Sequence, residues 1–407
     1  MKKYLLFAVV FSAVCASYGQ IANGQTSPNP PTGGAPNSSD SGIAQGGESS
    51  PLGGDKRGVL DAILRVNNHW QATRSPLCRG FWDNAAYFTG NQAVYELTGK
   101  QEYLDYALAW AEYNHWKGAT QTDKSKWEYA TYGEDMNHVL FADWQICFQV
   151  YIDLYKLEHR AERLQRTLEV MMYQAKSKEA DYWWWSDALY MGLPIFSKLY
   201  TVTHNERLLD KQYECFKWTD DLLWDKDQHL YYRDGKYVWP KVKTACNEGK
   251  SFWARGDGWV LAGLAKVLQD LPKDSKYRPF YVQRFQQLAK AVAECQQPEG
   301  YWTRSMLCEA DAPGYETSGT AFFTYGMLWG MNNGLLSVKD FKPVTDKAWK
   351  YLTTIALQSD GGIGYVQPIG EKPDPTRIAD AKSQHPFGTG AWLLAACEYY
   401  KSLAAKE

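Results

Sequence analysis

Asp187 stands where a carboxyl group could become an acid catalyst. It follows three consecutive tryptophans, Trp183, Trp184 and Trp185, and opens the apolar run ALYMGLPIF. Indole rings around a carboxyl group exclude water, which raises its pKa towards the range that a general acid needs. The structural alternative is that Asp187 or Ser186 caps the N-terminus of a helix, a position that both residue types favour.

A second aspartate, Asp143, lies within the segment FADWQICFQVYIDLY, which we expect to be one mostly apolar helix. A charged side chain in the middle of such a helix needs a partner or a chemical role to offset the cost of burial. The alternative is that Asp143 lies on a narrow exposed stripe. Asp135 and His138, at the start of the same segment, are interpreted first as turn and cap residues.

The segment SFWARGDGWVLAG places Arg255 between Trp253 and Trp259. Arginine can bind a carboxylate through two parallel hydrogen bonds, and an indole ring can stack on the C–H face of a sugar. We therefore interpret these three residues as candidate binding residues for a carboxylated sugar, with a purely structural role as the alternative. The chain has no Gly-x-Ser-x-Gly elbow, P-loop or dinucleotide fingerprint.

Helical periodicity predicts the elements that position these residues. Apolar side chains recur at intervals of three and four in several segments, most clearly from Tyr281 to Cys295. Such segments alternate with more apolar, Gly- and Ala-rich ones, for example RGDGWVLAGLAKVLQDL and HPFGTGAWLLAACEYY. Helices that are apolar on nearly all sides must be enclosed, so we predict an all-α fold in which helical hairpins close into an (α/α)6 barrel. An open solenoid of the same hairpins is the alternative.

In such a barrel the segments that open the inner helices converge on one mouth, and the candidate residues stand at those positions. Helix N-termini carry partial positive charge, which favours an anionic ligand such as a carboxylated sugar.

Composition narrows the class of ligand. The 407 residues carry 44 Lys+Arg and 46 Asp+Glu, a formal net charge of −2, which argues against a nucleic-acid partner. The chain has 18 Trp and 28 Tyr. So many aromatic side chains suit either an aromatic-lined sugar cleft or a large core, and composition alone favours neither.

The N-terminal part is expected to lie outside the folded domain. Residues 1–19 have two lysines, a short apolar run and small residues, the layout of a secretory signal peptide. The residues before Cys15 make a poor lipid-attachment box. Residues 20–55 are rich in Gly, Ser, Pro, Asn and Gln and predict a disordered leader. We expect one catalytic domain at residues 56–407, no membrane-spanning segment, and a periplasmic or cell-surface location.

Seven cysteines follow Cys15, without a C-x-x-C pair, which argues against a zinc site or a disulfide scaffold. A single bridge among Cys246, Cys295 and Cys308 remains open. No metal or cofactor is expected.

Five segments together resemble glycoside hydrolase family 105, a relative of family 88. They are ADWQICFQVY, SDALYMGLP, WARGDGW, ETSGTAFFTYGMLWG and HPFGTGAWLLA, and the resemblance runs from Val59 to Tyr400. The family fold is the (α/α)6 barrel. Its members remove a 4,5-unsaturated uronic acid from the non-reducing end of oligosaccharides that polysaccharide lyases produce. They do so by hydrating the C4=C5 double bond.

The resemblance implies roles for individual residues. Asp187 matches the principal catalytic acid and Asp143 the supporting carboxylate. Trp253, Arg255 and Trp259 match the sugar-stacking and carboxylate-contacting residues, and Trp185, beside the proposed acid, is expected at the same mouth.

One position departs from the family pattern. Some relatives have a His in the loop that here reads Tyr231, Tyr232, Arg233 and Asp234, so that Arg233 takes its place. Arginine cannot shuttle protons near neutral pH, but it can bind a carboxylate or a second sugar. The departure leaves the identity of the substrate open.

Two other functions compete with this hypothesis. Asp143 and Asp187 could hydrolyse a saturated uronoside by an ordinary two-carboxylate mechanism. The barrel could also serve as a carbohydrate-binding protein without catalysis.

Overall fold

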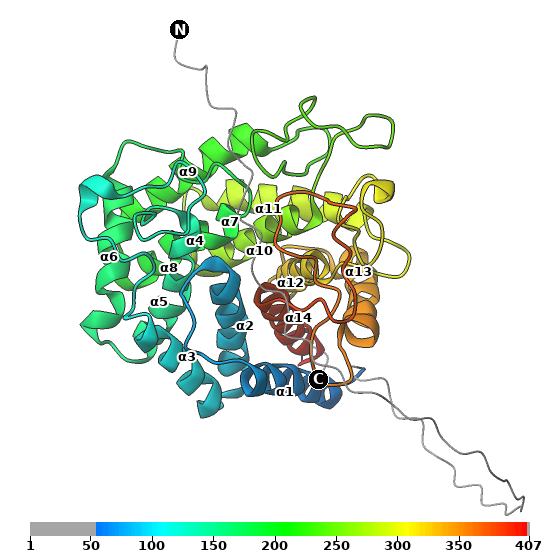
Figure 1. Cartoon of the computed structure of the whole chain (residues 1–407), viewed down its shortest axis with the longest axis horizontal. Helices are drawn as coiled ribbons and strands as arrows, with labels where there is room; N and C mark the ends of the chain where they lie inside the picture. Colours follow the sequence, from blue (N-terminus) through cyan, green and yellow to red (C-terminus); the bar gives the residue numbers. More distant parts are fainter. Residues whose placement is uncertain (1–53, 405–407) are drawn as a thin grey trace, which may run out of the picture. The chain divides into compact units, whose positions relative to one another are not determined.

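The computed structural model describes residues 54–404, and all regular secondary structure among them is helical (Figure 1). Isolated β-bridges replace strands in this part of the chain. The predicted all-α class is therefore confirmed. The expected signal peptide, and the expected leader up to residue 53, lie outside the described residues. In the part that is described, no helix combines the length and apolarity needed to cross a membrane.

Six inner elements form a closed ring. In order of contact they are α2 (Trp82–Thr98), α4 (Ala142–Gln145) continuing into α5 (Cys147–Leu157), α7 (Ala188–Met191) continuing into α8 (Leu193–Thr203), α10 (Ala254–Asp270), α12 (Thr317–Asn332) and α14 (Pro386–Ala404), which contacts α2. The ring closes, so the (α/α)6 barrel is confirmed and the open solenoid is excluded.

Each inner element packs against an outer helix, so that six hairpin-like pairs surround the axis (Figure 1). The outer helices are α1 (Lys56–Thr73), α3 (Gln101–Tyr113), α6 (Ala161–Lys176), α9 (Glu206–Leu223), α11 (Arg278–Glu294) and α13 (Val338–Tyr351). Burial follows the sequence pattern. Every residue of α12 from Thr317 to Gly330 is buried, whereas α11 buries the stripe that begins at Tyr281.

The ring closes at a contact between two glycines. A Cβ atom on Gly90 of α2 would lie 2.5 Å from the carbonyl oxygen of Gly390 in α14. A Cβ atom on Gly390 would lie 2.2 Å from the carbonyl oxygen of Ala86. Both positions therefore require glycine, because any side chain would push the first and last inner helices apart.

Two inner elements are broken, which differs from the sequence-based expectation. Pro194 has no N–H to continue the ladder of α7, and the free carbonyl of Tyr190 accepts a hydrogen bond from Gln149 Nε2 at 2.7 Å. Asp143 lies in the first turn of the short helix α4, which ends before Ile146, and not in the middle of one long helix. A carboxylate in a first turn is favoured by the helix dipole.

A disulfide joins two of the long segments that precede inner helices. Cys246, between α9 and α10, is bonded to Cys308, between α11 and α12. Beside it, the backbone N–H of Ala245 donates to Asp311 Oδ1 at 2.7 Å. Cys295 is a free thiol, which resolves the pairing that the sequence left open.

Candidate active site

Asp187 and Asp143 lie at the N-terminal ends of neighbouring inner elements, α7 and α4, which contact each other. Asp187 is 9 % exposed and Asp143 is 4 % exposed. Asp187 occupies the cap position of α7, but its side chain makes no capping hydrogen bond. The structural alternative, in which this carboxylate is only a helix cap, is therefore not supported, and neither is the exposed stripe for Asp143.

The two oxygens of Asp187 have different surroundings. Oδ2 accepts a hydrogen bond from Ser186 Oγ at 3.2 Å and lies 3.3 Å from Arg233 Nε. No other residue within 54–404 donates a hydrogen bond to Oδ1. The contacts with Ser186 and Arg233 favour the ionised form at Oδ2, so Oδ1 is the oxygen on which a proton is opposed least.

Burial raises the pKa of both carboxyl groups. It raises the pKa of Asp187, against the opposing charges of Arg233 and Arg255. The pKa of Asp143 lies well above its usual range, because the group is buried and because the charge of Asp187 is close. Two interacting carboxyl groups that share one cation do not both ionise easily, so one of them keeps a proton near neutral pH.

Arg233 is positioned beside Asp187 by the backbone. The N–H of Ser186 donates to the carbonyl of Arg233 at 2.7 Å, and a β-bridge pairs Trp185 with Asp234. The Arg233 guanidinium contacts three carboxylates. Its Nε faces Asp187, and its Nη1 lies 2.8 Å from Asp234 Oδ2 and 3.6 Å from Glu371 Oε2. The departure from the family pattern therefore places a cation directly on the candidate acid.

Arg255 binds backbone carbonyls and not, as the sequence suggested, an open carboxylate site. It is 1 % exposed, and its Nη1 and Nη2 donate to the backbone carbonyls of Gln367 and Pro368 at 2.8 and 2.9 Å. The guanidinium lies between the rings of Trp253 and Phe387. The two donors that a carboxylate would need are occupied, so the predicted bidentate clamp is not formed in this arrangement.

The predicted stacking residues are buried as well. Trp185, Trp253 and Trp259 are 1 %, 2 % and 0 % exposed, and Trp259 packs in the core against Tyr190 and Phe322. Side chains this deeply buried expose almost no ring surface on which a sugar could stack. Sequence patterns locate an indole near the mouth, but they do not reveal which ring faces solvent.

One aromatic side chain near Asp143 that does face solvent is Tyr132, which is 53 % exposed. Its ring packs edge-on against Phe141, two residues before Asp143, and its hydroxyl donates to Glu134. Arg79 forms an ion pair with the same Glu134 at 2.5 Å. The segment that carries Tyr132 and Glu134 has a polar, turn-rich sequence with no signal that identifies them.

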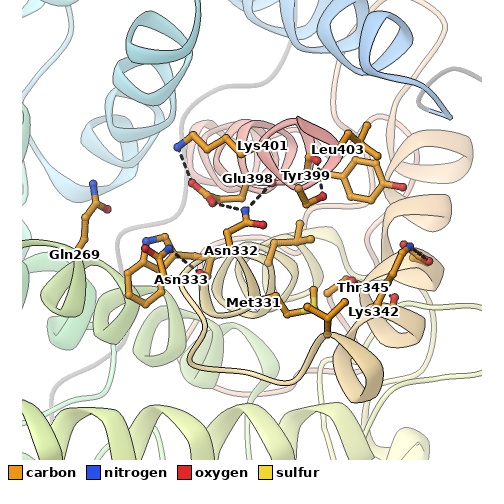
Figure 2. Close-up of a pocket in the computed structure, with 15 residues that line it drawn as sticks. Gln269, Met331, Asn332, Asn333, Lys342, Thr345, Glu398, Tyr399, Lys401 and Leu403 are labelled. Carbon is orange, nitrogen blue, oxygen red and sulfur yellow. Dashed lines mark hydrogen bonds and ion pairs between the residues drawn. The ribbon is translucent and has the colours of Figure 1, made fainter. Parts of the chain in front are cut away.

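The molecule also has a cavity away from the two candidate carboxyl groups. It has a volume of about 670 Å³ and is lined by the C-terminal parts of α12 and α14 together with α13 (Figure 2). Figure 2 shows the Glu398 carboxylate between Asn332 and Lys401, which donate to it at 2.8 and 2.7 Å. Both oxygens of the Glu398 carboxylate are thus paired, and neither Asp143 nor Asp187 lines the cavity. Size alone does not make it the reaction site.

Comparison with known proteins relates the sequence and fold of this chain to carbohydrate-active enzymes. The sequence profile of Glycosyl Hydrolase Family 88 matches residues 55–403. A solved structure described as a glycosyl hydrolase family 88 protein from Bacteroides vulgatus is 52 % identical, with a TM-score of 0.83, and the match covers 85 % of this chain and 99 % of that one. Another, described as a polysaccharide lyase, is 56 % identical with a TM-score of 0.83, covering 86 % and 98 %.

Curated relatives carry a more specific name. An "Unsaturated 3S-rhamnoglycuronyl hydrolase" from Formosa agariphila is 39 % identical over 222 residues, which are 54 % of this chain and 58 % of that protein. A protein of the same name from Alteromonas sp. is 33 % identical over 216 residues, 53 % of this chain and 51 % of the relative. The chain thus matches little more than half the length of these relatives. A family 105 structure from C. acetobutylicum, 21 % identical with a TM-score of 0.64 and covering 84 % of this chain and 98 % of that one, shares the fold.

Proposed function

The chain belongs to Glycosyl Hydrolase Family 88, and from this premise we propose that it removes a 4,5-unsaturated uronic acid from the non-reducing end of an oligosaccharide. One observation carries the proposal: a buried carboxyl group, Asp187, keeps one oxygen free while an arginine and a serine hold the other. The names of the curated relatives support the same substrate class. The resemblance to family 105 motifs agrees with it.

In the proposed reaction Asp187 acts as a general acid on a carbon atom. The C4=C5 bond is part of a vinyl ether, and its C4 is a weak base, so the proton donor must still be protonated at the working pH. Proton transfer from Oδ1 to C4 breaks the double bond and leaves positive charge shared between C5 and the ring oxygen. The Asp187 carboxylate that results is stabilised by Arg233 and Ser186 at Oδ2.

Water then completes the reaction. It adds to C5, and its proton returns to Asp187, which restores the acid. The hemiketal at C5 opens by breaking the bond from C5 to the ring oxygen, which leaves a ketone at C5 and a hemiacetal at C1. This hemiacetal collapses to an aldehyde and releases the remaining saccharide as an alcohol, so one water is consumed for each glycosidic bond that is broken. In this scheme Asp143, on the neighbouring helix, supports Asp187 as a coupled carboxyl group, since the charge of Asp187 raises the pKa of Asp143. Arg233 is placed to attract the uronate carboxylate.

The decisive assay follows the ultraviolet absorbance of the unsaturated uronate. Unsaturated disaccharides from pectin, ulvan and glycosaminoglycans would be incubated with the protein. We expect the absorbance to decay with at least one of them, because hydration destroys the conjugated double bond. Absence of decay with all of them, together with release of a saturated uronate from an ordinary uronoside, would favour the two-carboxylate hydrolase. Binding without any turnover would favour the non-catalytic alternative.

The same assay separates a second candidate, a polysaccharide lyase. The observation in its favour is the description of the 56 % identical structure. A lyase creates an unsaturated uronate by β-elimination, so the absorbance would rise on an intact polysaccharide. The two activities thus change the signal in opposite directions, and polysaccharide and unsaturated disaccharide would be tested side by side.

The pKa shift of Asp187 predicts the pH dependence. A general acid works only in its protonated form, so kcat/KM should fall as the pH rises through the raised pKa of this group. The charged groups that act on it are Arg233 and Arg255, and Asp143 is coupled to it because the charge of Asp187 raises the pKa of Asp143. Replacing Arg233 by Gln removes a cation that favours the ionised form. We therefore expect the falling limb of the Arg233→Gln profile to move to higher pH, and a limb that stays in place would contradict the assignment.

A further inference from the structure

Residues 367–377, which we call the strap, lie in the segment between α13 and α14 and are held by arginines. Arg255 donates to the backbone carbonyls of Gln367 and Pro368. Arg304 donates from Nη1 to the carbonyl of Asp374 at 2.7 Å and also contacts the carbonyl of Arg377. Because both arginines are 3 % exposed or less, the two ends of the strap are fixed by buried donors.

The middle of the strap reaches the candidate active site through one side chain, Glu371. Its carboxylate accepts hydrogen bonds from Lys236 Nζ at 2.7 Å and from the hydroxyl of Tyr237 at 2.8 Å. It also lies 3.6 Å from Arg233 Nη1. Partial burial opposes ionisation, but these donors together lower the pKa of Glu371, so it is a carboxylate at neutral pH.

Among the three carboxylates on Arg233, Glu371 is the one that can be exchanged. The side chains of Asp187 and Asp234 are 13 % and 5 % exposed, whereas that of Glu371 is 46 % exposed. Its contact with Arg233 is also the longest of the three. An exposed, long ion pair is weak, so an incoming anion can compete with it.

A displaced Glu371 also has somewhere to go. A cavity of about 150 Å³ adjoins it, and its lining includes the cations Arg304, Lys372 and Arg377 together with one other anion, Asp374, which forms an ion pair with Arg377. The carboxylate can therefore leave Arg233 without losing all contact with positive charge.

We propose that Glu371 is a specificity-determining residue: it occupies Arg233 in the free protein as an internal stand-in for a uronate carboxylate, which takes its place on binding. The identity of the ligand as a uronate rests on the proposed function. A sugar without a carboxylate cannot make this exchange, because it offers no charge to replace the one that Arg233 would lose. The residue thus discriminates against neutral sugars before any chemistry occurs.

The test measures binding and does not depend on turnover. Sodium glucuronate and sodium galacturonate, with the methyl ester of galacturonate as a neutral probe, would be titrated calorimetrically into the full-length protein. Glu371→Gln keeps the size of the side chain and an acceptor for Tyr237 while it removes the competing charge. We expect about three- to fivefold tighter binding of at least one uronate and no gain for the ester.

A matched control is Glu248→Gln. Glu248 is an exposed carboxylate that pairs with Lys243 at 2.6 Å. Its replacement by Gln changes the net charge by the same amount as Glu371→Gln. We expect this variant to bind like the original protein. Equal gains in both variants would mean that only the overall charge matters, and the proposal would fall.

A double-mutant cycle tests the route through Arg233. In an Arg233→Gln background, Glu371→Gln should give no gain, because the cation for which the two anions compete is absent. If Arg233→Gln does not fold, Arg233→Ala supplies the same background. A gain that persists without Arg233, or weaker binding by Glu371→Gln alone, would overturn the proposal. If the absorbance does not decay but the double-mutant cycle gives the expected result, the proposed reaction is rejected and the displacement of Glu371 stands. If the absorbance decays but the cycle fails, the reaction stands and the displacement is rejected.

Discussion

Replacing Asp187 by Asn is expected to lower kcat/KM on an unsaturated disaccharide by at least about a thousandfold. The amide keeps the shape of the side chain and can still accept the hydrogen bond from Ser186. It cannot deliver a proton from Oδ1 to carbon, so the first step of the proposed reaction stops. The initial rate of absorbance decay measures the loss.

Stability distinguishes this loss from misfolding. Since burial raises the pKa of Asp187, its ionised form costs folding free energy at neutral pH, and a neutral amide removes that cost. We therefore expect the thermal unfolding midpoint of Asp187→Asn to be unchanged or higher. Asp221→Asn, on a side chain that is 67 % exposed, is the matched control and should retain full activity. An Asp187→Asn protein that is folded and active would remove Asp187 from the mechanism.

Replacing Asp143 by Asn should have the second-largest effect, a loss of roughly a hundredfold. Asp143 is buried and accepts no hydrogen bond from the residues of 54–404, so we expect its carboxyl group to act through its electrostatic coupling to Asp187. The two carboxyl groups repel each other when both are ionised, so they titrate as a coupled pair that retains one proton near neutral pH. An amide at position 143 removes this repulsion, so Asp187 loses its proton at a lower pH.

The pH profile of kcat/KM for Asp143→Asn tests how Asp143 acts. Removing a negative neighbour lowers the pKa of Asp187, so the falling limb of kcat/KM for Asp143→Asn should move to lower pH. This is the opposite direction to the shift expected for Arg233→Gln. If Asp143→Asn lost activity equally at every pH, Asp143 would act by direct contact with water or sugar and not through the charge of Asp187.

The fold could be predicted from the sequence because burial leaves a periodic pattern. The stripe from Tyr281 to Cys295 predicts an amphipathic outer helix, and α11 buries those positions up to Val292. The nearly uniform apolarity of α12 predicts an enclosed helix, and α12 is buried along most of its length. Breaks were harder to predict. The helix break at Pro194 has a local cause, the missing N–H of proline. The break at Ile146 has no proline to mark it in the sequence.

The candidate site was only partly predictable. Residue type and neighbours suffice to identify Asp187 and Asp143, because a carboxyl group in an apolar run is unusual anywhere. The partner of a side chain depends on contacts that the sequence does not display. Arg255 and Trp259 have the right types for sugar binding, yet one is bonded to backbone carbonyls and the other lies in the core. Glu371, in a charged and proline-containing loop, became recognisable only through its distance to Arg233.

The contact between Gly90 and Gly390 has a consequence for the order in which the protein becomes active. Asp143 and Asp187 come from the second and third inner elements, Arg233 precedes the fourth, and Glu371 precedes the sixth. During synthesis the first inner helix lacks its most extensive neighbour until the last one has been made, because α2 packs mainly against α14. The nascent chain can therefore present its acid long before the strap and the final helix arrive. Catalytic competence should switch on in a single late event, when the two glycines meet.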